Sequence, residues 1–189
     1  MTDSYISARA ISDNIASNRL SEDCTTIINS LDDLHEYCES SFSLVIIKVP
    51  KSLALLEDQL HRIRDVLDEG SIVIAAGMTK NIHNSTLSHF EKIIGPTRTS
   101  RAQKKSRLIF SQYEPDLAVA DNPFPKQYAL PYQLDGNDIV LSSHAAVFSQ
   151  GKLDIGSRFL IENIPQCEQY NSIVDLGCGN GAVGLVAAI

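Results

Sequence analysis

The residues of this chain best suited to chemistry are three glycines at alternate positions near its end, Gly177, Gly179 and Gly181. A short apolar run precedes them at residues 173–174, and an apolar segment of helical composition follows, which together predict a strand, a tight turn and a helix. Glycine suits such a turn because a side chain would keep the backbone away from a ligand, while free N–H groups at the helix start favour an anion. The pattern predicts a nucleotide-binding βα unit.

Two kinds of cofactor fit this loop. Gly177, Gly179 and Ala182 match the dinucleotide fingerprint G-x-G-x-x-A, which would make the protein an NAD-dependent oxidoreductase. Asp175 and the three glycines instead match the loop with which class I methyltransferases hold S-adenosylmethionine. A carboxylate two residues before the first glycine opposes a pyrophosphate, but it suits a ligand with a cationic amino-acid end and hydroxyl groups. We therefore favour S-adenosylmethionine, with a dehydrogenase and a purely structural glycine turn as alternatives.

The composition is that of an ordinary globular protein, with 43% hydrophobic and 21% charged residues. The net charge of −7 argues against a protein that coats nucleic acid nonspecifically, but it leaves room for a local basic patch.

We expect no membrane segment, because no apolar run approaches about 18 residues, and no metal site, because the histidines lack metal-ligand spacing. The cysteines lack C-x-x-C spacing, which favours reduced thiols in a cytoplasmic protein. Cys178, inside the glycine loop, is interpreted as a packing residue rather than a catalytic thiol.

The order of the predicted elements favours an α/β fold with a mostly parallel sheet. Amphipathic spacing predicts helices at residues 4–18, 53–67 and 84–94, and apolar runs predict strands at residues 25–29, 42–50, 71–77 and 107–110. The run at 42–50 is typical of a strand buried on both faces. Four prolines within residues 113–131 indicate a linker, after which we expect strands at 136–143 and 145–148 and a helix at 154–164.

Two groups of basic residues are candidates for phosphate contacts. Residues 97–107 hold five of the sixteen Lys and Arg residues and no acid, which fits either a nucleic-acid contact or a solvated loop. Two further lysines follow a predicted buried strand, where α/β proteins often bind ligands, and they suit an RNA phosphate or a structural turn. The candidate RNA-binding residues are Arg98, Arg101, Lys104, Lys105, Arg107, Lys48 and Lys51.

Five segments spread over nearly the whole chain resemble the bacterial 23S rRNA guanine-N2 methyltransferases of the large ribosomal subunit. They are DSYIS (residues 3–7), IKVPKSLALLE (47–57), FEKIIGPT (90–97), VFSQGKLDIGSRF (147–159) and VDLGCGNG (174–181). The resemblance implies two Rossmann-like class I methyltransferase units. The first, at residues 1–115, would be a degenerate copy that helps recognise RNA. A linker at 116–127 would join it to the start of an S-adenosylmethionine-binding catalytic unit at 128–189.

The resemblance also assigns roles to individual residues. One group would line the methionine and ribose side of the cofactor: Asp175, Gly177, Gly179 and Gly181. A second group would close the pocket from the other side: Phe148, Ser149, Asp154 and Gly156. Family members carry a catalytic Asn-Pro-Pro-Phe tetrapeptide further along the sequence than this chain extends, and an earlier strand and glycine loop before it begins.

We therefore expect an internal piece of a larger protein that is truncated after its glycine loop, holds no catalytic residue and is inactive alone. The whole enzyme is expected to be cytoplasmic and monomeric, with 23S rRNA as its partner and with neither metal nor membrane. The alternative is a non-catalytic RNA-binding or ribosome-assembly module with a vestigial cofactor loop.

Overall fold

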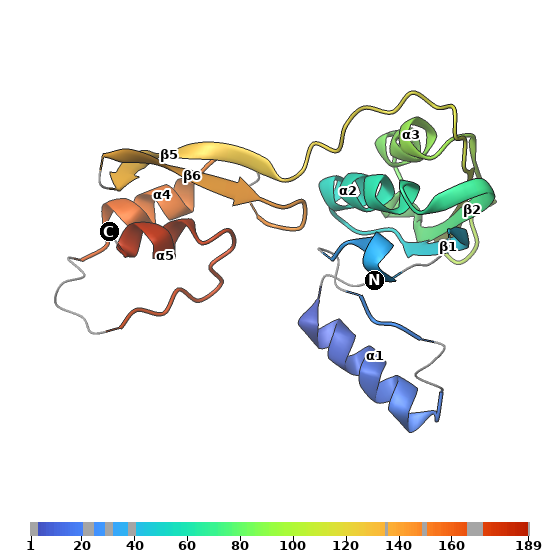
Figure 1. The fold of residues 1–189 in the computed structure, drawn as a ribbon, viewed down its shortest axis with the longest axis horizontal. Coiled ribbons are helices and arrows are strands. Elements are labelled where there is room, and N and C mark those ends of the chain that lie inside the picture. Colours follow the sequence, from blue (N-terminus) through green and yellow to red (C-terminus); the bar gives the residue numbers. More distant parts are fainter. Residues whose placement is uncertain are drawn as a thin grey trace. The chain divides into compact units, whose positions relative to one another are not determined.

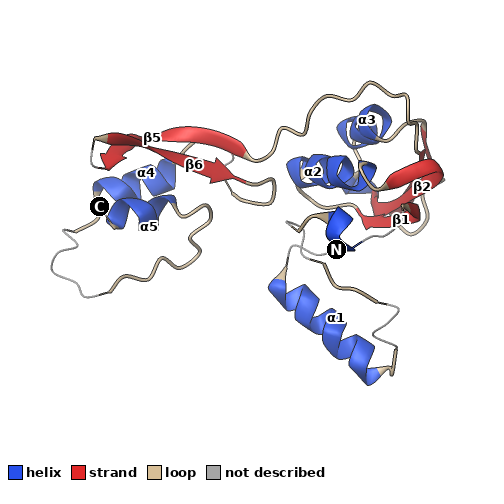
Figure 2. Ribbon diagram, viewed as in Figure 1, coloured by secondary structure: helices blue, strands red, loops and turns tan. Residues whose placement is uncertain are grey.

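The structure, a computed structural model, describes residues 4–20, 25–28, 32–37, 41–134, 136–148, 151–165 and 172–188. Contacts divide the chain into two compact units, unit 1 (Met1–Asn122) and unit 2 (Pro123–Ile189) (Figure 1). Both units contain helices and strands (Figure 2), which confirms the predicted α/β class. The assignment of the units to RNA recognition and cofactor binding stays a prediction, as do the domain boundaries.

Unit 1 is built on a four-stranded sheet with the strand order β1-β2-β4-β3. Its strands are β1 (Phe42–Lys48), β2 (Leu67–Met78), β3 (Thr97–Thr99) and β4 (Ser106–Gln112). Its helices are α1 (Tyr5–Ser17), α2 (Leu53–Arg64) and α3 (Asn84–Ile93), with the short 3-10 turns η2 (Leu34–Tyr37) and η3 (Thr79–Asn81). The three predicted helices and three of the four predicted strands are confirmed. The exception is the strand predicted at 25–29, because residues 25–28 form no strand.

The sheet is mixed rather than mostly parallel. β1 and β2 are parallel, whereas β4 is antiparallel to both β2 and β3. β3 and β4 are joined by a tight turn through Lys104 and Lys105, between the bridged residues Gln103 and Ser106. Such a turn can join only antiparallel strands, since a parallel pair needs a crossover of about a dozen residues. The predicted mostly parallel sheet was therefore wrong, and the prediction also missed β3, which lies inside the basic run.

One face of this sheet is covered by α2 and α3. Leu56 and Leu60 of α2 and Phe90 of α3 are almost completely buried, in one core with Val73 of β2 and Ile109 of β4. Both helices place apolar residues every three or four positions, so that one stripe faces the sheet. Burial of each large apolar side chain stabilises the fold by about 1.5–3 kcal/mol.

The opposite face is exposed in the part of the chain that the structure describes. Leu44 and Ile46 of β1, Ile72 of β2 and Leu108 of β4 have exposed fractions of 51%, 76%, 44% and 40%. β1 was expected to be buried on both faces, but from Leu44 onward its residues alternate between exposed and half-buried. This alternation is typical of a strand whose sheet is covered on one face.

Gly95 lets the chain turn from α3 into β3. Its φ of +145° lies in a region that favours glycine. A Cβ at this position would stand 2.4 Å from the carbonyl oxygen of Gln112 and 2.8 Å from Cβ of Glu114. The Glu114 N–H also donates to the Ile94 carbonyl at 2.9 Å. The end of α3 and the end of β4 are therefore in backbone contact, which only glycine permits.

We expect Gly95→Ala to destabilise unit 1 by more than about 3 kcal/mol, because the added methyl group must displace backbone atoms. Gly70→Ala is the matched control. Gly70 also has a positive φ, +89°, but nothing lies within 4 Å of an added Cβ, so only a conformational penalty of about 1–2 kcal/mol remains. Urea unfolding of both variants measures the difference, and equal losses would contradict the role of close packing at Gly95.

Unit 2 combines a β-hairpin with two helices that lie on one side of it (Figure 1). β5 (Lys126–Leu134) and β6 (Asn137–Ser143) are antiparallel, and α4 (Ile155–Glu162) contacts α5 (Ala182–Ala187). The core joins Leu130, Ile139 and Leu141 of the hairpin to Ala182 of α5. The strand predicted at 136–143, the helix predicted at 154–164 and the helix after the glycine loop are confirmed.

Two strand predictions in unit 2 were wrong, and one strand was missed. Residues 145–148 and 173–174 form no strand. Ile173 and Val174 are exposed, and no strand of the described residues pairs with them. β5 was taken for linker because of its proline content. Pro131 lies inside β5, between Ala129 and Gln133, where the pairing with β6 is irregular, and such an irregularity accommodates a residue without an N–H.

Candidate functional site

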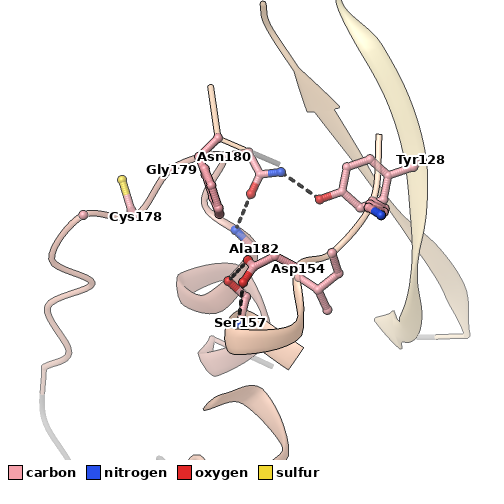
Figure 3. Close-up of a pocket in the computed structure, with 11 residues that line it drawn as sticks. Tyr128, Asp154, Ser157, Cys178, Gly179, Asn180 and Ala182 are labelled. Atoms are coloured by element: carbon pink, nitrogen blue, oxygen red, sulfur yellow. Dashed lines mark hydrogen bonds between the residues drawn. The ribbon is translucent and has the colours of Figure 1, made fainter. Parts of the chain in front are cut away.

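The glycine loop and the segment before α4 line a cavity in unit 2 (Figure 3). It opens to solvent, and about 380 Å³ of space, open solvent included, lies between its lining residues. Four residues that were predicted to hold a cofactor line it: Phe148, Asp154, Gly177 and Gly179. Ala182, which was named only in the alternative dinucleotide fingerprint, also lines it. The remaining lining residues were not predicted as part of a cofactor site; they are Tyr128, Lys152, Leu153, Ser157, Cys178 and Asn180.

The glycines of the loop face open space. Gly177, Gly179 and Gly181 have φ values of +77°, +58° and +81°, and nothing lies within 4 Å of a Cβ placed on any of them. They are therefore required by backbone conformation and not by packing against the protein. Open space beside a glycine turn allows a ligand to approach the backbone closely.

Asn180 fixes the glycine loop to the hairpin. Its Nδ2 donates to the Tyr128 hydroxyl at 2.8 Å and to Oγ of Ser143 at 3.0 Å (Figure 3 shows the Tyr128 bond). Its Oδ1 accepts the Ala182 N–H at 3.3 Å. One side chain thus connects β5, β6 and the start of α5, so the hairpin sets the position of the loop.

Asp154 caps α4 at the wall of the cavity. Its Oδ1 accepts the N–H groups of Gly156 at 2.9 Å and Ser157 at 3.2 Å, and its Oδ2 accepts the Ser157 hydroxyl at 2.5 Å. These hydrogen bonds, above all the one from the Ser157 hydroxyl, hold the pKa of the Asp154 carboxyl below its ordinary value. The cavity wall therefore carries a negative charge at neutral pH. Gly156 serves this cap and does not line the cavity.

The Asp175 carboxylate is bound within the protein. Its Oδ2 accepts the Gly184 N–H of α5 at 2.9 Å, and Asp175 does not line the cavity. Its predicted cofactor contact stays a prediction, as does that of Gly181, which caps α5 outside the cavity lining. Ser149 lies outside the described residues.

Ser157→Ala should raise the pKa of the Asp154 carboxyl toward the ordinary aspartate value of about 3.9, because the strongest hydrogen bond to the carboxylate is lost. A carboxyl whose pKa is lowered in the folded state stabilises the fold at every pH above its ordinary pKa. This contribution disappears as the pH falls through the pKa of the folded state. Carbon NMR titration of the carboxyl group measures the change, with Ser157→Thr as a control that keeps the hydroxyl. An unchanged pKa in Ser157→Ala would show that the hydroxyl is not its cause.

Both predicted groups of basic residues contribute to one edge of the sheet in unit 1. β1, β2 and β3 end at this edge, and β4 begins there because it is antiparallel to its neighbours. The segments at the edge, residues 48–52, 79–81 and 100–107, contain seven of the sixteen Lys and Arg residues and no acid. We call this set the basic edge: Lys48, Lys51, Lys80, Arg101, Lys104, Lys105 and Arg107.

The opposite edge of the same sheet carries acids together with Arg64, whose guanidinium donates to the carbonyls of Ile93 and Glu114. Asp65 ends α2, Asp68 and Glu69 stand at the start of β2, and Glu114 follows β4. Six residues of the basic edge are exposed, and none of the seven forms an ion pair with a described residue. An anion is therefore attracted to the basic edge although the chain as a whole is acidic.

Thr79 holds the turn that carries two of these lysines. Lys104 and Lys105 have φ values of +48° and +62°, which residues other than glycine rarely adopt. The Lys105 carbonyl accepts the Thr79 N–H at 2.9 Å and the Thr79 hydroxyl at 3.2 Å. The turn is thus attached to the segment that carries Lys80, a residue that was not among the predicted RNA-binding residues.

Arg98 and Arg107 differ from the other predicted RNA-binding residues. The guanidinium of Arg98 lies over the Phe110 ring, 4.7 Å from its centroid, within the β3–β4 pair. Arg107 is half-buried beside Gly77, and its Nε has no hydrogen-bond partner in the described structure. The position of Arg98 fits a packing role, and the RNA contacts predicted for both residues stay predictions.

Within the described ranges, no helix is long and apolar enough to span a membrane. No group of three His, Cys, Asp or Glu side chains there is placed to hold a metal ion. Cys178 is a free, exposed thiol, and the other cysteines, Cys24, Cys38 and Cys167, lie outside the described residues.

Comparison with known proteins gives the family. A model described as the RLMG N-terminal domain matches residues 1–115, which is more than half of the chain. The chain belongs to the RLMG N-terminal domain family. A second model, the methyltransferase small domain, matches residues 138–189 of the chain, a range that contains the glycine loop.

Curated relatives match all or nearly all of the chain. A protein of Streptomyces griseus named ribosomal RNA large subunit methyltransferase G is 43% identical over 190 residues, covering 100% of this chain and 48% of the relative. A protein of the same name from Yersinia pestis is 45% identical, covering 98% of this chain and 45% of the relative. The chain thus spans about half the length of the curated relatives it matches.

A solved structure of a T. thermophilus 16S rRNA N2 methyltransferase, in complex with AdoMet and guanosine, matches with a TM-score of 0.47 and 19% identity. The match covers 66% of this chain and 33% of that chain. At that TM-score the likeness supports no further statement about this chain.

Sequence signals exist for two of the residues that were missed. Asn180 stands two positions before Ala182, the spacing at which an asparagine side chain accepts a backbone N–H. Lys80 closely follows a second predicted buried strand, at residues 71–77, which is the kind of position by which Lys48 and Lys51 were chosen. Tyr128 had no such signal, because β5 was not predicted.

Proposed function

We propose that this chain is part of an S-adenosylmethionine-dependent methyltransferase that acts on guanine N2 in 23S rRNA. The observation that carries the proposal is a cavity at the glycine loop in a chain of which 98–100% matches ribosomal RNA large subunit methyltransferase G proteins. The choice of guanine N2 depends on the sequence resemblance. An rRNA substrate also supports action in the cytoplasm.

The residues of the cavity fit S-adenosylmethionine. When bound, this cofactor supplies a methyl group that is activated by the adjacent sulfonium cation. The charged Asp154 carboxylate suits the cationic amino-acid end of the cofactor, and Tyr128 and Phe148 offer aromatic surface to a cation or an adenine ring. The role of this chain in the proposed reaction is to bind and orient the cofactor, and orientation supplies much of the rate of such a transfer.

The basic edge of unit 1 is the proposed RNA contact. Its cations come from three segments, and the absence of acids among them leaves their charge uncompensated. Contacts of this kind bind phosphates without reading sequence, so they position RNA and leave the choice of base to the pocket that receives the guanine.

Gly177→Ala in the full-length protein should weaken S-adenosylmethionine binding at least about tenfold, because the new methyl group projects into the space proposed for the ligand. Gly136→Ala is a matched control: both glycines have a φ of +77° and nothing within 4 Å of an added Cβ, but Gly136 does not line the cavity. Isothermal titration calorimetry measures the affinities. Equal affinity in the two variants would contradict the proposed site.

The wild-type titration also separates the alternatives. Binding of NAD in place of S-adenosylmethionine would favour an oxidoreductase. RNA binding without any cofactor binding would favour a non-catalytic RNA-binding module.

Changing Arg101, Lys104 and Lys105 together to Ala should weaken the binding of 23S rRNA by the full-length protein. It should also reduce the slope of log affinity against log salt by about 0.7–0.9 for each phosphate that the variant no longer neutralises. A control variant removes three exposed cations elsewhere, Arg9, Arg19 and Lys92, and so makes the same change in net charge. Filter binding at several salt concentrations measures both slopes. Equal slopes for the two variants would reject the basic edge as the RNA contact.

A further inference from the structure

A second cavity lies in unit 1, at the edge of the sheet that carries the basic residues. It opens to solvent, and about 430 Å³ of space, open solvent included, lies between its lining residues. Its lining comes from the segment after β1, from the start of α2, and from η3 and the start of α3. The glycine loop takes no part in it, because all of its residues belong to unit 1.

The cavity has an apolar side and a polar side. The apolar side is formed by Pro50, which is half-buried, and Leu53, which exposes 38% of its surface. Val49 and Leu56 lie beneath them in the core. A nucleobase presents two flat faces of low polarity, and a base turned out of its strand packs against aromatic or apolar side chains. The apolar side therefore suits a base better than a sugar or a phosphate.

The polar side carries hydrogen-bonding groups that the protein does not use. Asn81 is half-buried, and neither its side-chain amide nor the side chains of Lys51 and Ser85 form a hydrogen bond or ion pair with a described residue. The Thr86 hydroxyl, in contrast, is occupied, because it accepts the His83 N–H at 3.2 Å. An amide offers both a donor and an acceptor, which matches the edge of a base.

Cations stand next to this cavity. Lys51 belongs to its lining, Lys48 ends β1 directly before the lining residue Val49, and Lys80 directly precedes Asn81. A phosphate attached to a nucleoside in the cavity would therefore meet positive charge. An apolar surface, an unused amide and flanking lysines together fit a nucleotide.

We propose that this cavity receives one nucleotide of the bound RNA, with its base turned out of the strand onto Pro50 and Leu53 and its edge facing Asn81. The inference rests on the proposed RNA binding of unit 1 and adds a site to it. A duplex whose bases are all paired can supply such a base only at the cost of unpairing and unstacking it, about a few kcal/mol. The cavity therefore gives the basic edge a preference for single-stranded or looped RNA.

The test compares two fluorescein-labelled RNAs, a single-stranded 12-mer and the same sequence in a perfect duplex, by fluorescence anisotropy with the full-length protein. Asn81→Leu removes the amide, and Ser85→Phe fills the cavity from an exposed helix position that tolerates a large side chain. Both variants should weaken single-strand binding about tenfold and leave duplex binding unchanged. Because no charge is removed, the salt slope should stay that of the wild type.

Asn84→Leu is the matched control, since it makes the same chemical change three residues away at a position outside the cavity lining. It should leave both RNAs unaffected. Unchanged single-strand binding in Asn81→Leu and Ser85→Phe, or an equal loss on the duplex, would overturn the inference. So would binding of GMP alone as tightly as the 12-mer, because the site would then take a free nucleotide.

The triple variant of Arg101, Lys104 and Lys105 separates this inference from the function on which it rests. If that variant binds both RNAs more weakly while the cavity variants bind both like the wild type, the basic edge is supported as the RNA contact and the nucleotide site is rejected. If all variants bind both RNAs like the wild type, RNA binding by unit 1 fails as well.

Discussion

The direction of β4 determines which charged residues meet in unit 1. Because β4 is antiparallel to β2 and β3, the turn that precedes it stands at the same edge as the ends of β1 and β2. If β4 ran parallel to β2, the turn before it would place Lys104 and Lys105 beside Asp68 and Glu69. The contact of α3 with the end of β4 at Gly95 and the bonds from Thr79 to Lys105 hold this arrangement at both ends of the strand. A chain with more acidic than basic residues thus presents a basic edge, because the strand directions bring its basic segments together.

Unit 2 depends on a different constraint, the attachment of a glycine-rich loop to a rigid support. Three glycines give the loop its conformation and leave open space beside it. Asn180 joins the loop to the hairpin, and Asp175 joins it to α5. The loop residues therefore keep a fixed position although they make few packing contacts. Unit 1 is suited to hold a large anion by charge, and unit 2 is suited to hold a small ligand by shape.

Local sequence patterns predicted the helices and most of the strands, because apolar spacing reports directly which face of an element is buried. Strand direction and edge neighbours depend on contacts between distant residues, so the mixed sheet and the meeting of Lys48 with Lys105 at one edge were not predictable. β5 was hidden by Pro131, which an irregular pairing accommodates. In the site, the glycine loop was evident from spacing. The role of Asn180 required the position of β5, and the bond from Gly184 to Asp175 required the fold of the loop itself.

Lysine acetylation of the full-length protein with and without 23S rRNA, read by mass spectrometry, tests the central claim most directly, because it reports which lysines the RNA covers. We predict protection of Lys48, Lys51, Lys80, Lys104 and Lys105. Lys92, exposed in the last turn of α3, should react equally in the free and the bound protein. Protection of Lys92 to the same extent as these five lysines, or no protection of the five, would contradict the basic edge as the surface that holds RNA.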